Sequence, residues 1–300
     1  MGRDSGIKWT KHTFNKWVGC TKVSPGCANC YAEVWARDNK DIRWGLGQPR
    51  RLTSTHNQNN PFRWEREAAK TGERTFVFSA SLSDWLDPEV PAEWLAGLLD
   101  TVVKTPRLTW QLLSKRPELW RERMHACLLV EGVNPAIKDW LDGKPPANVW
   151  VGTTVEDQAR ADLRIPALEA IPAVLRFLSC EPLIGGVDLN LMRDYAGDPS
   201  VPGGTYPVPT GEIGWVIIGG ESGDNARPFA LEWARSLVRQ CQEAGVPVFV
   251  KQYGDRPVDG GVAVPITSDA GGNQDEWEPE LQVREFPAER FPESETGIMN

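Results

Sequence analysis

The chain has 300 residues, of which 40% are hydrophobic and 25% charged, ordinary proportions for a globular protein with a large core. No apolar run approaches the ~20 residues of a membrane helix, and the polar start MGRDSGIKWTKHTF does not resemble a secretory signal, so we expect a cytoplasmic protein without membrane contact. The formal net charge of −8 argues against binding nucleic acid over the whole surface, because phosphates repel an acidic protein.

Short apolar runs rich in β-branched and aromatic residues alternate with helical segments along the chain, which is typical of βα units around a parallel sheet. Helices are clearest at 91–103 and 117–127, which open with proline, and at 231–244, which ends before Gly245. We predict an α/β fold, a partial (β/α) TIM-type barrel of six to seven parallel strands over residues 1–254. The expected strands are 13–18, 75–79, 108–113, 148–152, 174–178, 215–218 and 246–251.

Three stretches interrupt this pattern. Residues 40–73 are polar and rich in Asn, Arg and Trp, and we interpret them as an insertion after the first βα unit. Residues 193–211 predict a loop rich in Pro and Gly. From residue 255 to 300 the chain is acidic and punctuated by Pro and Gly, which predicts a peripheral or partly disordered tail.

Three of the six cysteines crowd into eleven residues, with the spacing C-x6-C-x2-C: Cys20, Cys27 and Cys30. They follow the first expected strand, and tight clustering in a chain of this size favours ligation over disulfides. Three thiolates on one loop suit a [4Fe-4S] cluster and leave one iron open to an external ligand. Two alternatives stay open, a structural zinc completed by His12 and three buried thiols without a metal.

Polar residues also follow each of the other six expected strands, at the end where a βα barrel has its active site. They are Ser79, Ser81 and Asp84; Ser114, Lys115 and Arg116; Thr153, Thr154 and Glu156; Ser179, Cys180 and Glu181; Gly219, Gly220, Glu221 and Ser222; Lys251 and Gln252. Any one of these could be a helix cap, but together they predict a polar barrel mouth.

Charged residues at such a mouth must be paired or functional. We therefore expect Glu181 and the pair Lys115 and Arg116 to contact substrate or cofactor, and Cys180 to be either a hydrogen-atom donor or a small buried thiol. The sequence Gly-Gly-Glu-Ser at 219–222 would let the backbone approach a ligand while the carboxylate takes an amine or ribose hydroxyl. The further cofactor-binding candidates are Tyr31, Ser81, Asp84 and Glu156.

Several ordered motifs resemble a family of phage and prophage proteins of unknown function that have a three-cysteine motif and are related to radical S-adenosylmethionine enzymes. They lie within residues 7–254: IKWTKHTFNKWVGCTKVSPGCANCYAE, FSASLSDWLD, LLSKRPE, NVWVGTTVEDQ, RFLSCEPLIGGVDL, WVIIGGESGDNARPF and FVKQYG. The resemblance implies a partial barrel with a cluster on Cys20, Cys27 and Cys30.

The cysteine spacing differs from the commonest radical-enzyme pattern, C-x3-C-x2-C, by three additional residues between the first two cysteines. Asn29 stands where that pattern usually has an aromatic residue, and Tyr31 could pack against adenine in its place. Cys180 stands where relatives often have a small residue without a thiol.

The first functional hypothesis is a radical enzyme that cleaves S-adenosylmethionine reductively to modify or repair a nucleic-acid base or nucleotide, with an electron donor such as flavodoxin or ferredoxin. Residues 1–75 favour such a substrate, since they hold 14 Lys and Arg against 7 Asp and Glu. Indoles in this segment could stack on a base: Trp9, Trp17, Trp35, Trp44 and Trp64.

The alternative hypothesis is a non-catalytic, zinc-stabilised nucleic-acid-binding protein. In either case the acidic tail could dock a partner, such as a companion protein encoded nearby.

Overall fold

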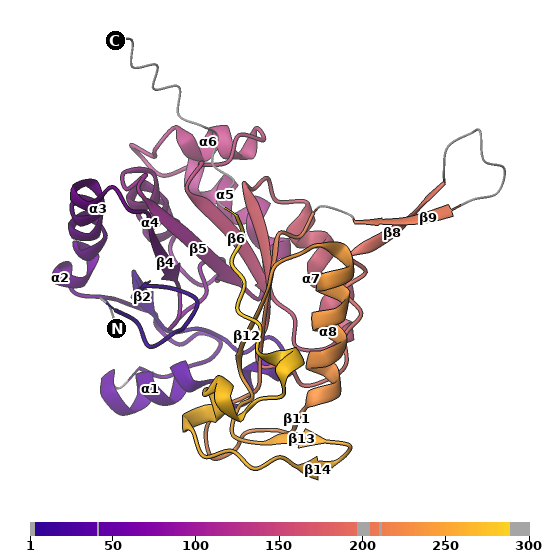
Figure 1. Cartoon of the computed structure of the whole chain (residues 1–300). Coiled ribbons are helices and arrows are strands. Elements are labelled where there is room, and N and C mark those ends of the chain that lie inside the picture. Colours follow the sequence, from indigo (N-terminus) through magenta and orange to yellow (C-terminus); the bar gives the residue numbers. More distant parts are fainter. Residues whose placement is uncertain (1–3, 41, 197–204, 210–211, 289–300) are drawn as a thin grey trace.

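The centre of the structure is a seven-stranded parallel sheet curled into a half-barrel (Figure 1). The computed structural model describes residues 4–40, 42–196, 205–209 and 212–288. The predicted α/β partial barrel is confirmed, because every neighbouring pair of these strands is parallel. In spatial order the strands are β1 (His12–Phe14), β4 (Thr75–Ser79), β5 (Leu108–Ser114), β6 (Val149–Thr154), β7 (Leu175–Cys180), β10 (Trp215–Gly219) and β12 (Val248–Gln252).

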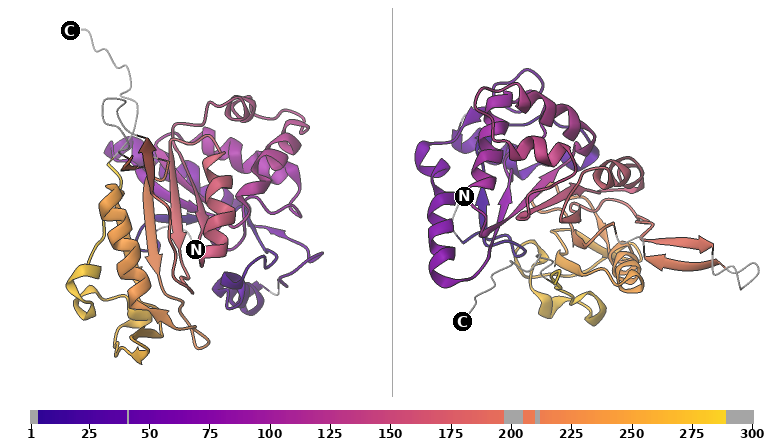
Figure 2. Two further views of the ribbon diagram at one scale, coloured as in Figure 1. Left: turned by 90° about the vertical axis from the view of Figure 1, so that its right-hand side faces the viewer. Right: turned by 90° about the horizontal axis from the view of Figure 1, so that it is seen from above.

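Helices cover the outer face of the half-barrel (Figures 1 and 2). Alternate strand residues such as Val77, Leu112 and Val216 point outward and join the helices in the main core. The helices are α3 (Asn60–Thr71), α4 (Ala92–Val103), α5 (Trp120–Leu128), α6 (Ala136–Leu141), α7 (Gln158–Glu169) and α8 (Leu231–Ala244).

The inward residues form a second, aromatic core that closes one end of the half-barrel. Trp9 lies among the buried rings Phe78, Trp150, Phe177 and Trp215. Further along the same strands the inward positions become polar, and Trp150 in β6 and Phe177 in β7 are followed by Thr154 and Ser179. The alternation therefore gives a packed aromatic floor below a polar mouth.

The first expected strand, 13–18, is two short strands in the structure. After β1 the chain turns at Asn15, whose amide donates to Ser81 Oγ (2.8 Å) and accepts from the backbone N–H of Leu82 (2.8 Å). The following β2 (Trp17–Val18) pairs antiparallel with β3 (Arg51–Leu52) instead of continuing the sheet. The prediction of one continuous strand was wrong because the buried Asn15 amide accepts from the backbone N–H of Leu82, a donor that a longer ladder would use.

Residues 40–73 contain ordered elements. After α1 (Tyr31–Lys40) and β3 the chain forms α2 (Thr55–Gln58) and then α3. Trp64 and Ala68 of α3 are buried in the main core, so the end of this segment serves as the helix that crosses from β1 to β4. The earlier part of the segment lies beside the loop that carries the cysteines.

Residues 193–211 were expected to be a loop, and their described part is a hairpin of β8 (Met192–Ala196) and β9 (Thr205–Pro209) that extends away from the barrel (Figure 2). Residues 197–204 and 210–211 lie outside the described residues.

The chain after residue 254 contributes to the folded unit. Strands β11 (Phe229–Ala230), β13 (Pro257–Asp259) and β14 (Val262–Ala263) form a small sheet. Trp277 and Leu281 are buried in the main core, and Arg284 forms an antiparallel bridge with Phe249. The domain boundary at 254 stays a prediction, and residues 289–300 of the expected tail lie outside the described residues. Short 3-10 turns occur at Pro117–Leu119, Asp269–Gly271, Gln274–Glu276 and Pro279–Leu281.

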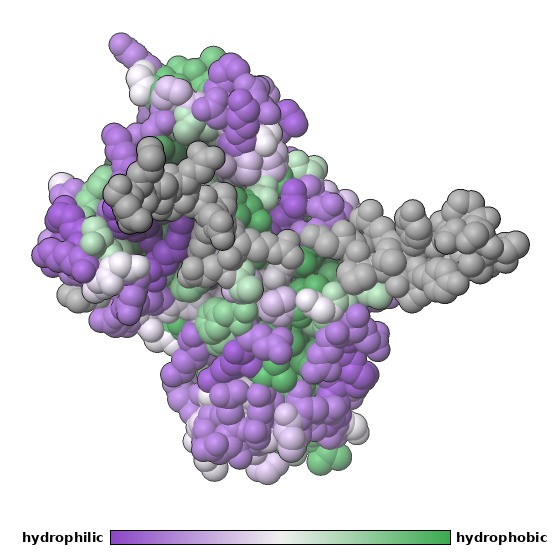
Figure 3. Space-filling model, turned by 45° about the horizontal axis from the view of Figure 1, so that its top comes forward, coloured by the Kyte–Doolittle hydropathy of each residue, from purple (hydrophilic) through white to green (hydrophobic). Residues whose placement is uncertain are grey.

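Hydrophilic residues cover most of the surface that Figure 3 shows, while hydrophobic residues gather toward its middle. Among the described residues, no helix is both long and apolar enough to span a membrane.

Candidate functional site

A pocket opens where the carboxyl ends of the barrel strands meet the cysteine loop, residues 19–30. Cys20, Cys27 and Cys30 all line this pocket. The opposite wall comes from the strand ends, and its residues include Ser81, Lys115, Thr154, Glu181, Glu221 and Lys251. The predicted polar mouth and the three cysteines therefore face one space.

The cysteine loop begins at Gly19, which has the left-handed φ of 114°, and it contains a 3-10 turn at Pro25–Cys27 before α1 starts at Tyr31. The three loop cysteines are half-buried free thiols, whereas the other three are fully buried elsewhere: Cys127, Cys180 and Cys241. In the described ranges, no group of three or more His, Cys, Asp or Glu side chains is arranged to hold a single metal ion.

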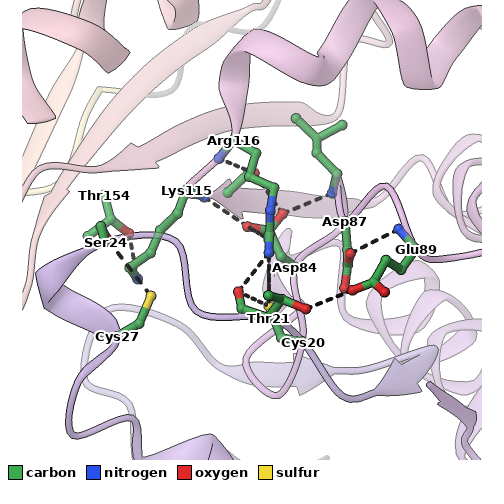
Figure 4. Close-up of polar contacts among 12 residues, drawn as sticks. Cys20, Thr21, Ser24, Cys27, Asp84, Asp87, Glu89, Lys115, Arg116 and Thr154 are labelled. Atoms are coloured by element: carbon green, nitrogen blue, oxygen red, sulfur yellow. Dashed lines mark hydrogen bonds and ion pairs between the residues drawn. The ribbon is translucent and has the colours of Figure 1, made fainter. Parts of the chain in front are cut away.

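Arg116 connects the end of β5 to the first cysteine (Figure 4). Its Nη1 and Nη2 lie 3.5 and 3.6 Å from Cys20 Sγ, and Nη2 also donates to the carbonyl of Thr21 (2.7 Å). Asp84 fixes the guanidinium through an ion pair of 3.0 Å and accepts further hydrogen bonds from Ser114 Oγ and the Lys115 N–H. Burial and then the charge of Asp84 raise the pKa of the Cys20 thiol to about 12, while Arg116 opposes this rise.

Arg50 holds the same end of the loop from the other side. Its guanidinium is buried and pairs with Asp87 (2.9 Å) and Glu89 (2.6 Å). Its Nη2 donates to Thr21 Oγ1 (2.8 Å), and that hydroxyl in turn donates to Glu89 (2.7 Å). This contact explains why the polar segment before β3 lies against the cysteine loop.

Glu156 supports the middle of the loop. The carboxylate is fully buried, pairs with Arg164 of α7 (2.7 Å) and accepts a hydrogen bond from the backbone N–H of Gly26 (3.2 Å). A Cβ at position 26 would lie 3.0 Å from the Glu156 carboxyl carbon, so glycine allows this close approach. Glu156 does not line the pocket; in the structure it holds the loop, and its cofactor-binding role stays a prediction.

Glu221 and Arg227 support the end of the loop. Arg227 contacts the carboxylate through Nε (2.9 Å) and Nη2 (2.6 Å) and donates through Nη1 to the carbonyl of Pro25 (2.8 Å). Asn29 donates to Glu221 as well (3.0 Å). Burial opposes ionisation of Glu221, but these hydrogen bonds outweigh it and keep its pKa below the usual range.

Four arginine and carboxylate pairs thus hold a loop of twelve residues, 19–30. Asp84 and Glu221 line the pocket, as expected, whereas Glu156 does not. Each of the three carboxylates pairs with an arginine, and their cofactor-binding roles stay predictions. Sequence reasoning did not assign a role to Arg50, Arg164 or Arg227, since each meets its partner only in the folded chain.

Lys115, Glu181 and Lys251 remain at the pocket itself. Lys115 Nζ lies 3.2 Å from Thr154 Oγ1, and Figure 4 shows the side chain reaching toward Cys27. Lys251 pairs with Glu181, and both side chains are partly exposed to the pocket. The predicted placement of Lys115 and Glu181 at the barrel mouth agrees with the structure, while their roles stay predictions.

Most of the other residues expected to bind cofactor line the pocket, and some of them also contact the protein itself. Tyr31, Ser81, Gly220 and Ser222 line the pocket. The hydroxyl of Tyr31 donates to the carbonyl of Ser81 (2.9 Å), which ties the start of α1 to the strand ends. A Cβ at Gly220 would lie 2.0 Å from the Tyr253 carbonyl oxygen, and one at Gly219 would lie 3.3 Å from the Glu181 carboxyl carbon. The two glycines therefore accommodate atoms of the protein itself.

Cys180 and His12 lie away from the pocket. β7 alternates, so Ser179 faces the pocket and Cys180 is buried in the main core, where burial raises its pKa. Of the two alternatives for Cys180, its position agrees with the small buried thiol, and a role as hydrogen-atom donor stays untested. His12 is buried against Trp64 with the rings 4.3 Å apart, so it lies with α3 and does not join the cysteines.

Most of the tryptophans expected to stack on a base are core residues. Trp9, Trp17 and Trp64 are each no more than 3% exposed. Trp35 packs in a small core with Trp44, and of these two only Trp44 lines the pocket.

The fold and the site define an α/β partial barrel with a three-cysteine loop at the carboxyl ends of its strands. The chain belongs to a family described as proteins of unknown function (DUF5131), whose model matches residues 4–285. Membership of a family of unknown function is therefore confirmed. The phage or prophage origin of that family, its three-cysteine motif and its relation to radical S-adenosylmethionine enzymes stay predictions.

Two further comparisons complete this picture. The search of curated proteins finds no match. A solved structure of a single-residue mutant of spore photoproduct lyase is similar over 84% of this chain and 79% of that chain, with 11% identity and a TM-score of 0.38. A likeness of this size carries no information about function.

Proposed function

We propose that the protein is a radical S-adenosylmethionine enzyme that holds a [4Fe-4S] cluster on Cys20, Cys27 and Cys30. The observation that carries the proposal is that all three thiols of one loop line one pocket, opposite the polar strand ends of a partial barrel. The four arginine pairs support it further, because they fix the loop before any cofactor binds.

The donor set fits such a cluster. The loop supplies three thiols, and the remaining three cysteines are buried away from the pocket, so one iron would be left without a cysteine ligand. When bound, a reduced cluster of this kind supplies an electron that breaks a C–S bond of S-adenosylmethionine.

The residues of the pocket have chemistry that suits the second ligand. Lys115 and Lys251 offer positive charge to a carboxylate or phosphate, and Glu181 can accept a hydrogen bond from an amine or a ribose hydroxyl. Lys251 already pairs with Glu181, so a ligand amine would compete with this lysine for the carboxylate.

A nucleic-acid base or nucleotide is the proposed substrate class. It is supported by the excess of Lys and Arg in residues 1–75 and by Trp44 at the pocket. The proposed reaction also requires a one-electron donor such as flavodoxin or ferredoxin.

The test is anaerobic reconstitution with iron and sulfide, followed by reduction with dithionite in the presence of S-adenosylmethionine. We expect about four irons per chain, a four-iron electronic spectrum and production of 5′-deoxyadenosine, which nucleotides or oligonucleotides should increase if they are the substrate. Cys27→Ala should lose both iron and turnover, while the matched control Cys241→Ala, whose thiol on α8 is buried in the main core, should keep both.

A colourless protein with stoichiometric zinc and no cleavage of S-adenosylmethionine would overturn the proposal in favour of a zinc-stabilised binding protein.

A further inference from the structure

One of the four loop-holding arginines also touches a cysteine sulfur. Both terminal nitrogens of Arg116 point at Cys20 Sγ, at 3.5 and 3.6 Å. Arg116 is only 4% exposed. The other three arginines contact other groups of the loop. Arg50 donates to the Thr21 hydroxyl and Arg227 to the Pro25 carbonyl, while Arg164 acts through Glu156 on the Gly26 backbone. The hydrogen bond found at Cys27 Sγ involves Ser24 Oγ, a neutral group 3.8 Å away.

The contact at Cys20 is built to stay in place. Asp84 pairs with Nη1 and the Thr21 carbonyl accepts from Nη2, so the guanidinium plane is fixed at both nitrogens. Asp84 is itself held by Ser114 Oγ (2.6 Å) and by the N–H groups of Lys115 and Leu86 (2.9 Å each). A donor oriented in this way costs little to reorganise when the charge on the sulfur changes.

Hydrogen bonds to the sulfurs and nearby charge set the reduction potential of an iron–sulfur cluster. A buried cation that donates to one thiolate stabilises the reduced form, which carries one more negative charge. We propose that Arg116 is a positioning residue that makes the potential of the cluster less negative through Cys20, and that Asp84 limits this effect. The inference rests on the proposed function, because it requires a cluster on the loop.

Substitutions of Arg116 and Asp84 should shift the midpoint potential of the cluster in opposite directions. Arg116→Gln removes the charge and the paired donors, so the midpoint potential should become more negative. Asp84→Asn removes a negative charge beside the same sulfur but keeps an acceptor for Ser114 and Leu86, so the potential should become less negative. If both residues served only to hold the loop, their loss would shift the potential in the same direction or leave it unchanged.

The experiment is a redox titration of anaerobically reconstituted wild type, Arg116→Gln and Asp84→Asn, followed by electronic absorption and electron paramagnetic resonance, with iron and sulfide measured in each sample. The matched control is Arg227→Gln, which removes another arginine that holds the loop but contacts the Pro25 carbonyl instead of a sulfur. We expect the control to shift the potential less than Arg116→Gln, because the charge of Arg227 also acts on Cys27 but its hydrogen bonds go to Glu221 and Pro25.

A wild-type protein that forms no four-iron cluster would overturn the proposed function. Two outcomes would overturn only the present inference, provided that the wild type binds the cluster. One is an unchanged potential in Arg116→Gln, and the other is an equal shift of the potential in Arg227→Gln. If Arg116→Gln does not bind a cluster, Arg116→Lys takes its place, because it keeps the charge and loses the paired donors. Its midpoint potential should be more negative than that of wild type. A shift of Asp84→Asn to more negative potential would contradict the inference in that case.

Discussion

At the residue scale, the site depends on buried arginine and carboxylate pairs. Arg164 and Glu156 are only 3% and 0% exposed at their side chains, and Arg50 and Asp87 only 2% and 1%. Burying such pairs costs desolvation that the attraction does not always offset, so they are poor evidence of stability by themselves. Each pair here also touches or borders the cysteine loop, which indicates that they serve its geometry.

Glu156→Gln should destabilise the protein by about 3 to 5 kcal/mol, because it leaves the Arg164 charge buried without its partner. Urea unfolding measures this loss. The double variant Glu156→Gln with Arg164→Met should recover part of it, since no charge is then left unpaired. A double variant no more stable than Glu156→Gln would contradict this account.

At the element scale, alternation along the strands decides which side chains reach the pocket. In β7, Phe177 and Ser179 face inward while Leu178 and Cys180 face the helices. The same alternation requires a small residue at Gly152 of β6, because the Phe177 ring occupies the space where its Cβ would lie, at 2.4 Å. The aromatic floor of the barrel therefore depends on this glycine.

Gly152→Ala should cost about 1 to 3 kcal/mol, the usual range for overpacking a close-packed core. Thermal or urea unfolding measures the effect. Gly6→Ala is the matched control, because no atom lies within 4 Å of a Cβ there, and its stability should equal that of wild type. A wild-type stability for Gly152→Ala would contradict the packing described here.

At the scale of the whole molecule, the acidic residues after 254 are attached to the barrel by a charged cluster as well as by core contacts. Arg235 of α8 pairs with Asp259 (2.8 Å), Glu278 (2.7 Å) and Glu280 (2.9 Å). Trp277 stacks on Tyr253 with the rings 4.9 Å apart. Apolar and ionic contacts therefore both attach the segment 255–288, in addition to its strand pairing.

Arg235→Gln should leave the barrel folded but make proteolytic cleavage between residues 255 and 288 several-fold faster at neutral pH, because three carboxylates lose their common partner. Mass spectrometry of a protease time course measures this. In wild type the hydrogen bond from Arg235 lowers the pKa of Asp259, so its contribution is present above the unfolded pKa of about 4 and is lost only as the pH falls through the lower folded value. Cleavage at wild-type rates in the variant would show that Arg235 does not help to hold the segment.

The sequence by itself determined the partial barrel, the three-cysteine loop and the polar residues at the mouth. These features are local, since strand period, proline and glycine positions and cysteine spacing are set by neighbours in the chain. It also placed Lys115 and Glu181 at the pocket, because both follow strands directly.

Only the tertiary structure decided which carboxylates pair with an arginine that holds the loop and which pairs with a lysine at the pocket. Asp84, Glu156 and Glu221 have the same place in the pattern as Glu181, yet they pair with arginines, and for Glu156 and Asp84 the arginine lies 8 and 32 positions further along the chain. The direction of Cys180, the burial of His12 beside α3 and the contact of Arg116 with Cys20 likewise depend on packing between distant segments. Ion pairs and buried faces form by proximity in space, and a single sequence does not specify that proximity.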